Sequence, residues 1–253
     1  MVISPNTVFT GQQLIWLPAC PSTNTEAHQL LRENRASEGC TVITDDQTAG
    51  RGQRGNTWEA APAENLTLSV VWKPTFLAAT QQFLLSQAVA LAAHDWASRF
   101  LAAAEPLRLK WPNDLYFGAQ KLGGILIENT LGGAMIQASV VGLGLNVNQR
   151  HFGVPTATSL GLLTGRYFSR EELAARLLEC LEARYLQLRA GRVGELRRDY
   201  LARLYRYQEW HPYEVVGQRV QGRIAGVEAD GQLAVELEGQ GLRRFGLQEI
   251  RYV

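Results

Sequence analysis

The sequence predicts an α+β fold, in which a large mixed domain precedes a small all-β domain. Strand-like and helical segments are interspersed through residues 1–208, as expected of one large domain. Near Pro212 the composition changes, and the tail alternates apolar and polar residues with frequent glycines, which is typical of a small β-barrel. We therefore assign residues 1–208 to the first domain and residues 209–253 to the second.

The N-terminal part of the large domain should contain strands, one helix and a long loop. Short apolar or β-branched runs predict three strands: Leu14–Leu17, Thr41–Thr44 and Leu66–Trp72. Residues 22–24, Ser-Thr-Asn, are N-cap candidates for a helix that continues through Leu31. Residues 45–64 are polar and rich in glycine, and we expect them to form a loop.

The middle of the chain predicts a buried helix followed by strands. Residues 81–101 are rich in Ala and Leu and contain neither Gly nor Pro, which favours a helix. Three further strands are expected: Leu107–Lys110, Gly124–Asn129 and Ala134–Val147. The last two are separated by Leu-Gly-Gly, which predicts a hairpin. Residues 148–166 resemble a loop, and helical periodicity predicts two more helices: Arg170–Leu188 and Val193–Tyr207.

Composition excludes several classes of protein. A chain of 253 residues can bury a large core without disulfides, and its formal net charge of +1 disfavours a broadly basic nucleic-acid-binding surface. Its three cysteines match no zinc pattern and are expected to be reduced and mostly buried: Cys20, Cys40 and Cys180. Residues 1–11 contain no secretory signal, and no apolar run reaches the roughly 18 residues that cross a bilayer. We expect a cytoplasmic protein.

The predicted loop contains a glycine-rich hexapeptide, Gly50-Arg51-Gly52-Gln53-Arg54-Gly55. It formally matches a dinucleotide-binding fingerprint, which requires a helix opening within the glycines and an acidic residue about 20 positions later. Pro62 and an apolar strand occupy those positions instead, and the Gly-Lys-Ser/Thr of a P-loop is absent. The loop is either a surface loop or an anion site, in which arginines bind carboxylate or phosphate and Trp58 closes over a nucleotide.

Two more polar clusters lie near predicted strands. Lys110-Trp111-Pro112-Asn113-Asp114 combines cation, amide and carboxylate, although Asn-Asp is also common in turns. Lys121 enters an apolar run, where an ammonium is costly unless it is paired with an anion. Residues 142–148, Gly-Leu-Gly-Leu-Asn-Val-Asn, place small and polar groups at a strand end, which would also fit a β-bulge.

Taken in order, these segments resemble the motifs of biotin protein ligases. The resemblance rests on five segments between Ser22 and Asn148: 22–24, 47–58, 110–114, 121–128 and 142–148. The tail is similar to the small SH3-like C-terminal domain of that family. The resemblance implies a class II synthetase-like biotin/lipoate ligase catalytic domain with a small SH3-like β-barrel after it.

The family resemblance implies an ATP-dependent, AMP-forming ligase. Such enzymes join the biotin carboxylate to the α-phosphate of ATP, release pyrophosphate, and transfer biotin from biotinyl-5'-AMP to a lysine of a biotin carboxyl carrier protein, such as that of acetyl-CoA carboxylase. Two unit charges at roughly 4 Å repel by about 4 kcal/mol at an effective dielectric near 20, so a cation is needed between the reacting anions. Mg²⁺ is implied as the ion that screens the triphosphate.

Residue roles carry over to the positions that match the motifs. The implied catalytic residues are Lys121, Arg51 and Asp114, the last to guide the incoming amine. The implied biotin-binding residues are Ser22, Thr23, Gln47, Gly50, Arg51, Lys121, Gly124 and Gly142. The implied nucleotide-binding residues are Gln53, Arg54, Trp58, Asn113, Lys121 and Asn146. Hydroxyl and amide groups suit a buried ureido ring, Trp58 would stack on adenine, and Asn146 would bond the purine edge.

The chain also departs from the best-known bacterial motif, because Gln53 and Asn56 replace two arginines. We predict that Gln53 weakens retention of the adenylate. Only about 20 residues precede Ser22, which is too few for a winged-helix domain, so we expect no specific DNA binding. We expect no membrane partner. We also expect no protein metal site and no dedicated nucleophile, because the four histidines show no metal or triad spacing: His28, His94, His151 and His211. A homodimer, as in bacterial relatives, is a further expectation.

Other functions are less well supported by the sequence. A lipoate ligase or octanoyl transferase would share this fold, but the Gly-Arg-Gly loop with Trp58 and the Lys-Trp-Pro-Asn-Asp cluster favour biotin. A protein that stores biotin or its adenylate would not need Lys121 and Arg51 near the α-phosphate. A DNA-binding regulator would need a domain that the sequence does not predict.

Overall fold

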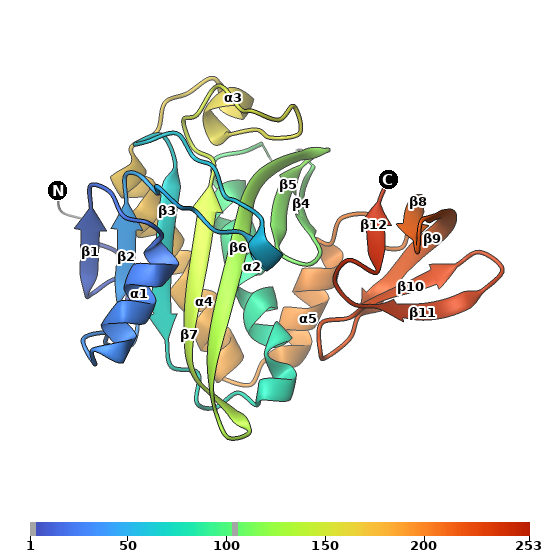
Figure 1. The fold of residues 1–253 in the computed structure, drawn as a ribbon, viewed down its shortest axis with the longest axis horizontal. Coiled ribbons are helices and arrows are strands. Elements are labelled where there is room, and N and C mark those ends of the chain that lie inside the picture. The colour runs from blue at the N-terminus through green and yellow to red at the C-terminus, as the bar shows by residue number, and fades with distance from the viewer. Residues whose placement is uncertain (1–3, 103–105) are drawn as a thin grey trace.

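The computed structural model describes residues 4–102 and 106–253. A seven-stranded mixed sheet, in the order β1-β2-β3-β7-β6-β5-β4, forms the centre of the large domain, and a five-stranded antiparallel sheet follows it (Figure 1). The strands of the large sheet are β1 (Leu14–Leu17), β2 (Thr41–Thr44), β3 (Leu66–Trp72), β4 (Leu107–Lys110), β5 (Asp114–Phe117), β6 (Gln120–Gly132) and β7 (Met135–Leu145). The predicted α+β class is confirmed.

Helices cover both faces of the large sheet. Helix α1 (Thr23–Arg32) packs on one face against β2, β3 and β7, while α2 (Phe83–Ser98), α4 (Arg170–Arg189) and α5 (Val193–Ala202) form a layer on the other (Figure 1). All seven residues of β3 are buried, because the strand lies between these layers. In the helical layer, Arg184 pairs with Asp95 at 2.6 Å and with Asp199 at 2.7 Å.

The central strands form a continuous antiparallel ladder beneath the long loop. Strand β7 pairs with β3 from Leu145 to Ser139 without a register shift, and a two-residue turn at Gly133 and Ala134 joins it to β6. The predicted hairpin is therefore confirmed. The pairing of β7 with β3 shows no register shift at Gly142 or Gly144. The alternative of a β-bulge at these glycines is therefore wrong.

Several element boundaries differ from those predicted. Strand β5 was not expected, because Asn113 and Asp114 suggested a turn. Strand β6 begins at Gln120, so Lys121 lies within it. A 3-10 turn over Ala79–Gln81 delays α2 to Phe83, α3 (Leu160–Thr164) lies in the predicted loop, and α5 ends at Ala202, after which Leu204 bridges to β4.

The C-terminal sheet has the strand content expected of a small SH3-like domain. Its strands are β8 (Trp210–Val215), β9 (Gln218–Val227), β10 (Leu233–Leu237), β11 (Gly241–Phe245) and β12 (Ile250–Tyr252). It contacts the large domain through Trp111, whose Nε1 donates to the carbonyl of Gly231 at 2.9 Å, and through Lys110, whose ammonium lies 4.8 Å from the ring centroid of Tyr252.

The three cysteines are free and buried, as predicted. Among the described residues no helix is long and apolar enough to cross a membrane.

Candidate active site

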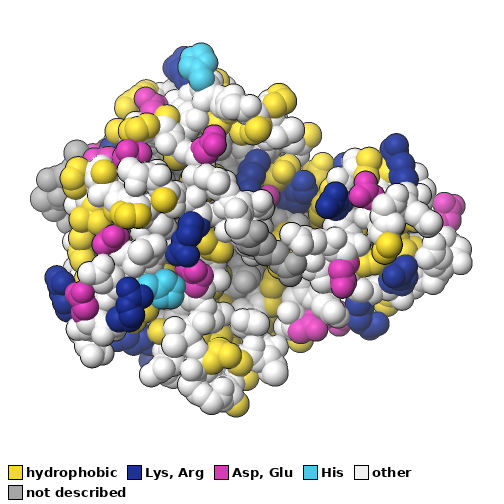
Figure 2. Space-filling view, viewed as in Figure 1, with side chains coloured by type: hydrophobic (Ala, Val, Ile, Leu, Met, Phe, Trp, Pro, Cys, Tyr) yellow, Lys and Arg dark blue, Asp and Glu magenta, His cyan; other side chains and the backbone are white. Residues whose placement is uncertain are grey.

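A cavity of about 260 Å³ opens between the long loop after β2 and strands β6 and β7. Figure 1 shows this loop crossing the face of β3, β7 and β6, and Figure 2 shows a hollow in the middle of the same face. The C-terminal sheet contributes residues to the lining through the segment between β11 and β12. The lining of the cavity includes mostly polar, charged and glycine residues from the loop, the start of α1, the large sheet and this segment: Ser22, Thr23, Asn24, Gln47, Arg51, Gln53, Trp58, Thr67, Asn113, Asp114, Lys121, Gly124, Gly142, Gly144, Leu247 and Gln248.

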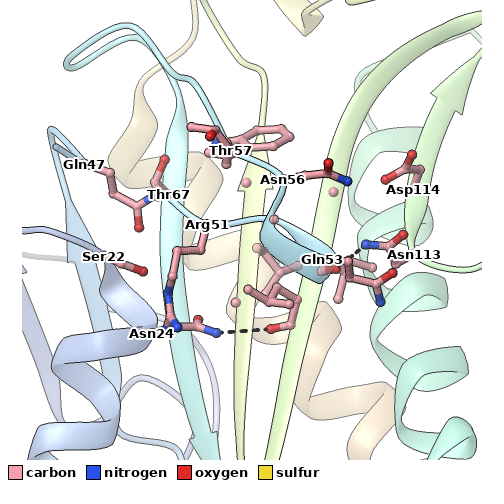
Figure 3. A pocket seen from close by; sticks show the side chains of 18 of the residues that line it. Ser22, Asn24, Gln47, Arg51, Gln53, Asn56, Thr57, Thr67, Asn113 and Asp114 are labelled. Atoms are coloured by element: carbon pink, nitrogen blue, oxygen red, sulfur yellow. Dashed lines mark hydrogen bonds between the residues drawn. The ribbon is translucent and has the colours of Figure 1, made fainter. Parts of the chain in front are cut away.

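One end of the cavity is lined by uncharged hydrogen-bonding groups. Ser22 and Thr23 lie at the start of α1, and the Oε1 of Gln47 accepts from the backbone N of Thr23 at 2.9 Å and from its Oγ1 at 3.3 Å. Ser22 and Thr23 are buried, and Figure 3 shows Ser22, Gln47 and Thr67 grouped on this side (Figure 3). This end can donate and accept hydrogen bonds without introducing charge.

The glycines of β7 allow side chains to lie directly on the strand. A Cβ atom at Gly142 would overlap the Oδ1 of Asn24, and one at Gly144 would overlap the indole of Trp58. Gly124 on β6 also lies under Trp58, with an added Cβ 3.4 Å from its Cζ3. The glycines are therefore required by close approach, which brings the loop and α1 down onto the sheet.

The other end of the cavity contains an ion pair between neighbouring strands. The Nζ of Lys121 on β6 lies 2.7 Å from the Oδ1 of Asp114 on β5, and the side chain of Lys121 is 33% exposed. The same ammonium lies 5.6 Å from the ring centroid of Trp58. Lys121 is thus paired with an anion, as predicted, and it remains open to the cavity.

A second cation reaches the cavity from the loop. Arg51 forms a bridge with Thr57, and the backbone N of Gly52 donates to the carbonyl of Asn56 at 2.6 Å. These contacts close the loop around a 3-10 turn, Gln53–Gly55. The guanidinium of Arg51 contacts Glu128 at 3.2 Å and is 46% exposed. Arg54 lies in the turn, and its side chain lies outside the described part of the structure.

The Lys-Trp-Pro-Asn-Asp segment faces two ways. Asn113 and Asp114 line the cavity, and the Nδ2 of Asn113 donates to the carbonyl of Ile125 at 2.7 Å. Lys110 points instead to Tyr116 and Tyr252, with its Nζ 3.1 Å from the hydroxyl of Tyr116. Burial lowers the pKa of Lys110, and the nearby carboxylate of Asp114 opposes that shift.

Most of the predicted site residues share this cavity, but two lie beside it. Gly50 lies against the carbonyl of Trp58 and lines a neighbouring cavity. Asn146 is buried, and its Nδ2 donates to the carbonyl of Thr158 at 2.9 Å. The proposed contact of Asn146 with a purine edge stays a prediction.

Sequence reasoning missed several residues of the lining. Asn24 and Gly144 lay within quoted motifs, but neither was assigned a role. Thr67 is a polar residue between two leucines of β3, Leu66 and Leu68, and that change of residue type was the available signal. Leu247 and Gln248 lie about 100 residues beyond the last motif, and only the fold brings them to the cavity.

The arrangement suits an elongated ligand with a neutral polar head and an anionic end. Hydroxyl and amide groups at one end offer partners for the head, and Lys121 can offset negative charge at the other. Arg51 adds a second cation on the side of Asn24 (Figure 3). A cation beside two anionic reactants lowers the repulsion between them.

Comparison with known proteins gives one family. Residues 16–146 match the model of the biotin/lipoate A/B protein ligase family. The chain is 34% identical over 223 residues to the biotin–[acetyl-CoA-carboxylase] ligase of Mycobacterium tuberculosis, covering 87% of this chain and 81% of that one. It is 29% identical over 257 residues to the bifunctional ligase/repressor BirA of Bacillus subtilis, covering 94% of this chain and 74% of that one.

The fold is also similar to solved structures. The biotin protein ligase from Aquifex aeolicus, solved in complex with biotin and ATP, superposes with a TM-score of 0.78 at 24% identity and covers 96% of this chain and 100% of that one. The biotin protein ligase from Leishmania major, in complex with biotinyl-5-AMP, gives a TM-score of 0.64 at 20% identity, with 93% and 99% covered.

Proposed function

Because the chain belongs to the biotin/lipoate A/B protein ligase family, we propose that it is a biotin protein ligase. It forms biotinyl-5'-AMP from biotin and ATP and transfers the biotinyl group to a lysine of a carrier protein. The observation that carries the proposal is one cavity that combines neutral hydrogen-bonding groups, among them Gln47 and Thr23, with two cations, Lys121 and Arg51.

The neutral end fits the ureido ring of biotin. A ureido group has one carbonyl acceptor and two N–H donors, so a buried site must supply both kinds of partner. The hydroxyls of Ser22 and Thr23 and the amide of Gln47 supply them. Gly142 on β7 and Gly124 on β6 are the proposed backbone contacts of the bicyclic ring, beside Asn24 and Trp58, which lie over them.

The cationic end fits the first reaction. An oxygen of the biotin carboxylate attacks the α-phosphorus, an acyl phosphate bond forms, and the bond to the leaving pyrophosphate breaks. Lys121 neutralises charge on the carboxylate and the α-phosphate, and Arg51 neutralises charge on the phosphates. Trp58 provides the aromatic face for adenine, and Gln53, Arg54, Asn113 and Asn146 complete the proposed nucleotide site.

We assign Asp114 to the second reaction. The carrier lysine must be neutral when its nitrogen attacks the acyl carbon of the adenylate, and AMP then leaves. The carboxylate of Asp114 faces the cavity beside Lys121, so it can orient the incoming amine and accept its proton.

Mg²⁺ belongs to the proposal as a companion of ATP. Mg²⁺ at nucleotide sites is usually held by the phosphates together with one or two protein side chains. Asn113, which lines the cavity, is the residue that would lie near it. When bound, Mg²⁺ screens the triphosphate.

The carrier and the setting are proposed on the same basis. A biotin carboxyl carrier domain is the expected acceptor, since the M. tuberculosis relative is named for acetyl-CoA carboxylase. A cytoplasmic location fits three free cysteines and the need for ATP. We propose no operator binding; a biotin-dependent footprint on a biotin operon would contradict this. A homodimer is also part of the proposal. Sedimentation in the analytical ultracentrifuge, with and without biotin, measures the oligomeric state.

The deciding experiment is pyrophosphate exchange into ATP in the presence of biotin, lipoate or octanoate. Exchange with biotin alone, followed by biotin-dependent labelling of a carrier domain, is the expected result. Exchange with lipoate or octanoate alone would assign the chain to the sister activities of the family. Biotin binding without exchange would assign it to storage.

A further inference from the structure

The carboxylate of Glu128, on β6, collects donors from two other parts of the chain. Its Oε2 accepts from the Nδ2 of Asn24 at 2.6 Å and lies 3.2 Å from the Nη2 of Arg51 and 3.3 Å from the Nε2 of His28. Asn24 and His28 are one turn apart on α1, so the helix presents both to the same strand. Glu128 thereby joins α1 to the loop that bears Arg51.

A buried network fixes Asn24. Its Oδ1 accepts from the Oγ of Ser69 at 2.6 Å, and Asn24 and Ser69 are 3% and 0% exposed. Breaking a buried hydrogen bond leaves a polar group without a partner and costs the full desolvation of that group. Asn24 therefore holds the carboxylate of Glu128 at one place on the sheet.

The same network begins at the residues proposed to bind the ureido ring. The Oγ of Ser69 lies 2.7 Å from the Oγ1 of Thr23, and Thr23 bonds to Gln47. A continuous path of polar contacts therefore runs from the neutral end of the cavity to Arg51. Buried networks of this kind rigidify the groups at their ends when every member is satisfied.

Arg51 needs such an anchor. It stands between Gly50 and Gly52, and its side chain is 46% exposed, so the loop alone leaves the guanidinium many conformations. Glu128 engages one end of the planar fork at Nη2, while the fork carries further N–H donors for a carboxylate or phosphate.

We propose that Glu128 is a positioning residue for adenylation, which holds Arg51 in the orientation that meets the reacting anions. This inference rests on the proposed function. Glu128 acts through Arg51 and does not touch substrate. A different role, in which Glu128 merely occupies Arg51 until substrate displaces it, predicts the opposite change in activity.

A double-mutant cycle tests the proposal. The variants are Glu128→Gln, Arg51→Ala and the double variant, assayed by biotin-dependent pyrophosphate exchange. We expect Glu128→Gln to lower kcat/KM by about tenfold, because a misplaced charged group costs catalysis even when it is present. In the Arg51→Ala background the same substitution should change kcat/KM by less than about twofold, because its target is gone.

Controls separate positioning from folding. Glu26→Gln removes a carboxylate charge at another place, on α1, and should leave exchange unchanged. All variants should unfold at the wild-type temperature. Glu128→Asp keeps the charge and should recover part of the lost activity. An equal loss from Glu128→Gln in both backgrounds, or a gain of activity in the wild-type background, would overturn the inference. A wild-type chain without exchange would instead count against the proposed function.

Discussion

The ammonium of Lys121 lies 2.7 Å from the Oδ1 of Asp114, across the pairing of β6 with β5. This contact places opposite charges side by side at the end of the cavity where we propose that two anions react. Lys121 is only one-third exposed, so its charge is less screened by water than that of a surface lysine. The pair therefore joins the residue proposed for adenylation to the residue proposed for transfer.

Replacement of Lys121 should remove the first reaction. We expect Lys121→Ala to lower kcat/KM for biotin-dependent pyrophosphate exchange by at least about 100-fold, because preorganised charge at a developing anion is typically worth that much. Lys121→Arg keeps the charge with a different shape and should retain more activity. Exchange assays on both variants measure the difference. Equal activity in Lys121→Ala and wild type would remove Lys121 from the mechanism.

Replacement of Asp114 should act chiefly on the second reaction. In Asp114→Asn the incoming amine loses its proton acceptor, and we expect transfer to the carrier to slow by about 100-fold. Adenylation should change far less. Single-turnover mixing of enzyme-bound adenylate with a carrier domain measures transfer, and exchange measures adenylation. A loss confined to exchange would show that Asp114 acts mainly through Lys121.

A methyl group at Gly144 should disturb the nucleotide end of the site. Its Cβ would overlap the indole of Trp58, so Gly144→Ala should displace the ring. Base–aromatic stacking is worth ~1–3 kcal/mol, and we expect the KM for ATP to rise by about tenfold. Gly226→Ala on β9 is the matched control, because an added Cβ there has no atom within 4 Å among the described residues. An unchanged KM in Gly144→Ala would argue against stacking on Trp58.

Gln53 should govern how long the adenylate stays bound. It lines the cavity from the 3-10 turn of the loop, where the best-known bacterial motif has arginine. We expect Gln53→Arg to slow dissociation of biotinyl-5'-AMP, because an arginine adds charge beside a phosphate. The rate of dissociation is measured by diluting enzyme loaded with labelled adenylate into excess unlabelled biotin and ATP. Identical off-rates would show that this position does not control retention.

The residues that were predictable from sequence are those whose type conflicts with their surroundings. Lys121 interrupts an apolar strand, and Gly142 interrupts another, so each required a chemical explanation. Residues 22–24 combined an N-cap pattern with a family motif. These signals are local, and they identified most of the cavity.

The parts that sequence did not predict depend on packing between distant segments. Strand β5 is only four residues long, and its register shift beside Leu115 has no local signature. Ser69 is an ordinary strand serine until α1 places Asn24 against it. Leu247 reaches the cavity because the C-terminal sheet docks on Trp111, a contact that neither segment reveals alone.

A buried histidine away from the site should make stability depend on pH. His94, on α2, is 13% exposed at its side chain and lies beside Leu107, Arg108 and Arg203. Burial, helped by Arg203, lowers the pKa of His94 to about 4 from an ordinary value of 6.5. His94 therefore binds a proton more weakly in the folded protein than in the unfolded chain.

The direction of the effect follows from that difference. Above pH 6.5 His94 is neutral in both the folded and the unfolded state, so it leaves the free energy of unfolding unchanged. As the pH falls toward 4, the unfolded state binds the proton first, so the free energy of unfolding decreases. Between pH 7 and pH 5 the loss due to this group is about 2 kcal/mol. His94→Gln should reduce the dependence by that amount, measured by urea unfolding at both values, while His151→Gln at an exposed position should keep the wild-type slope. If both variants keep it, His94 accepts its proton in the folded protein as readily as in the unfolded chain, and its burial has no linkage to folding.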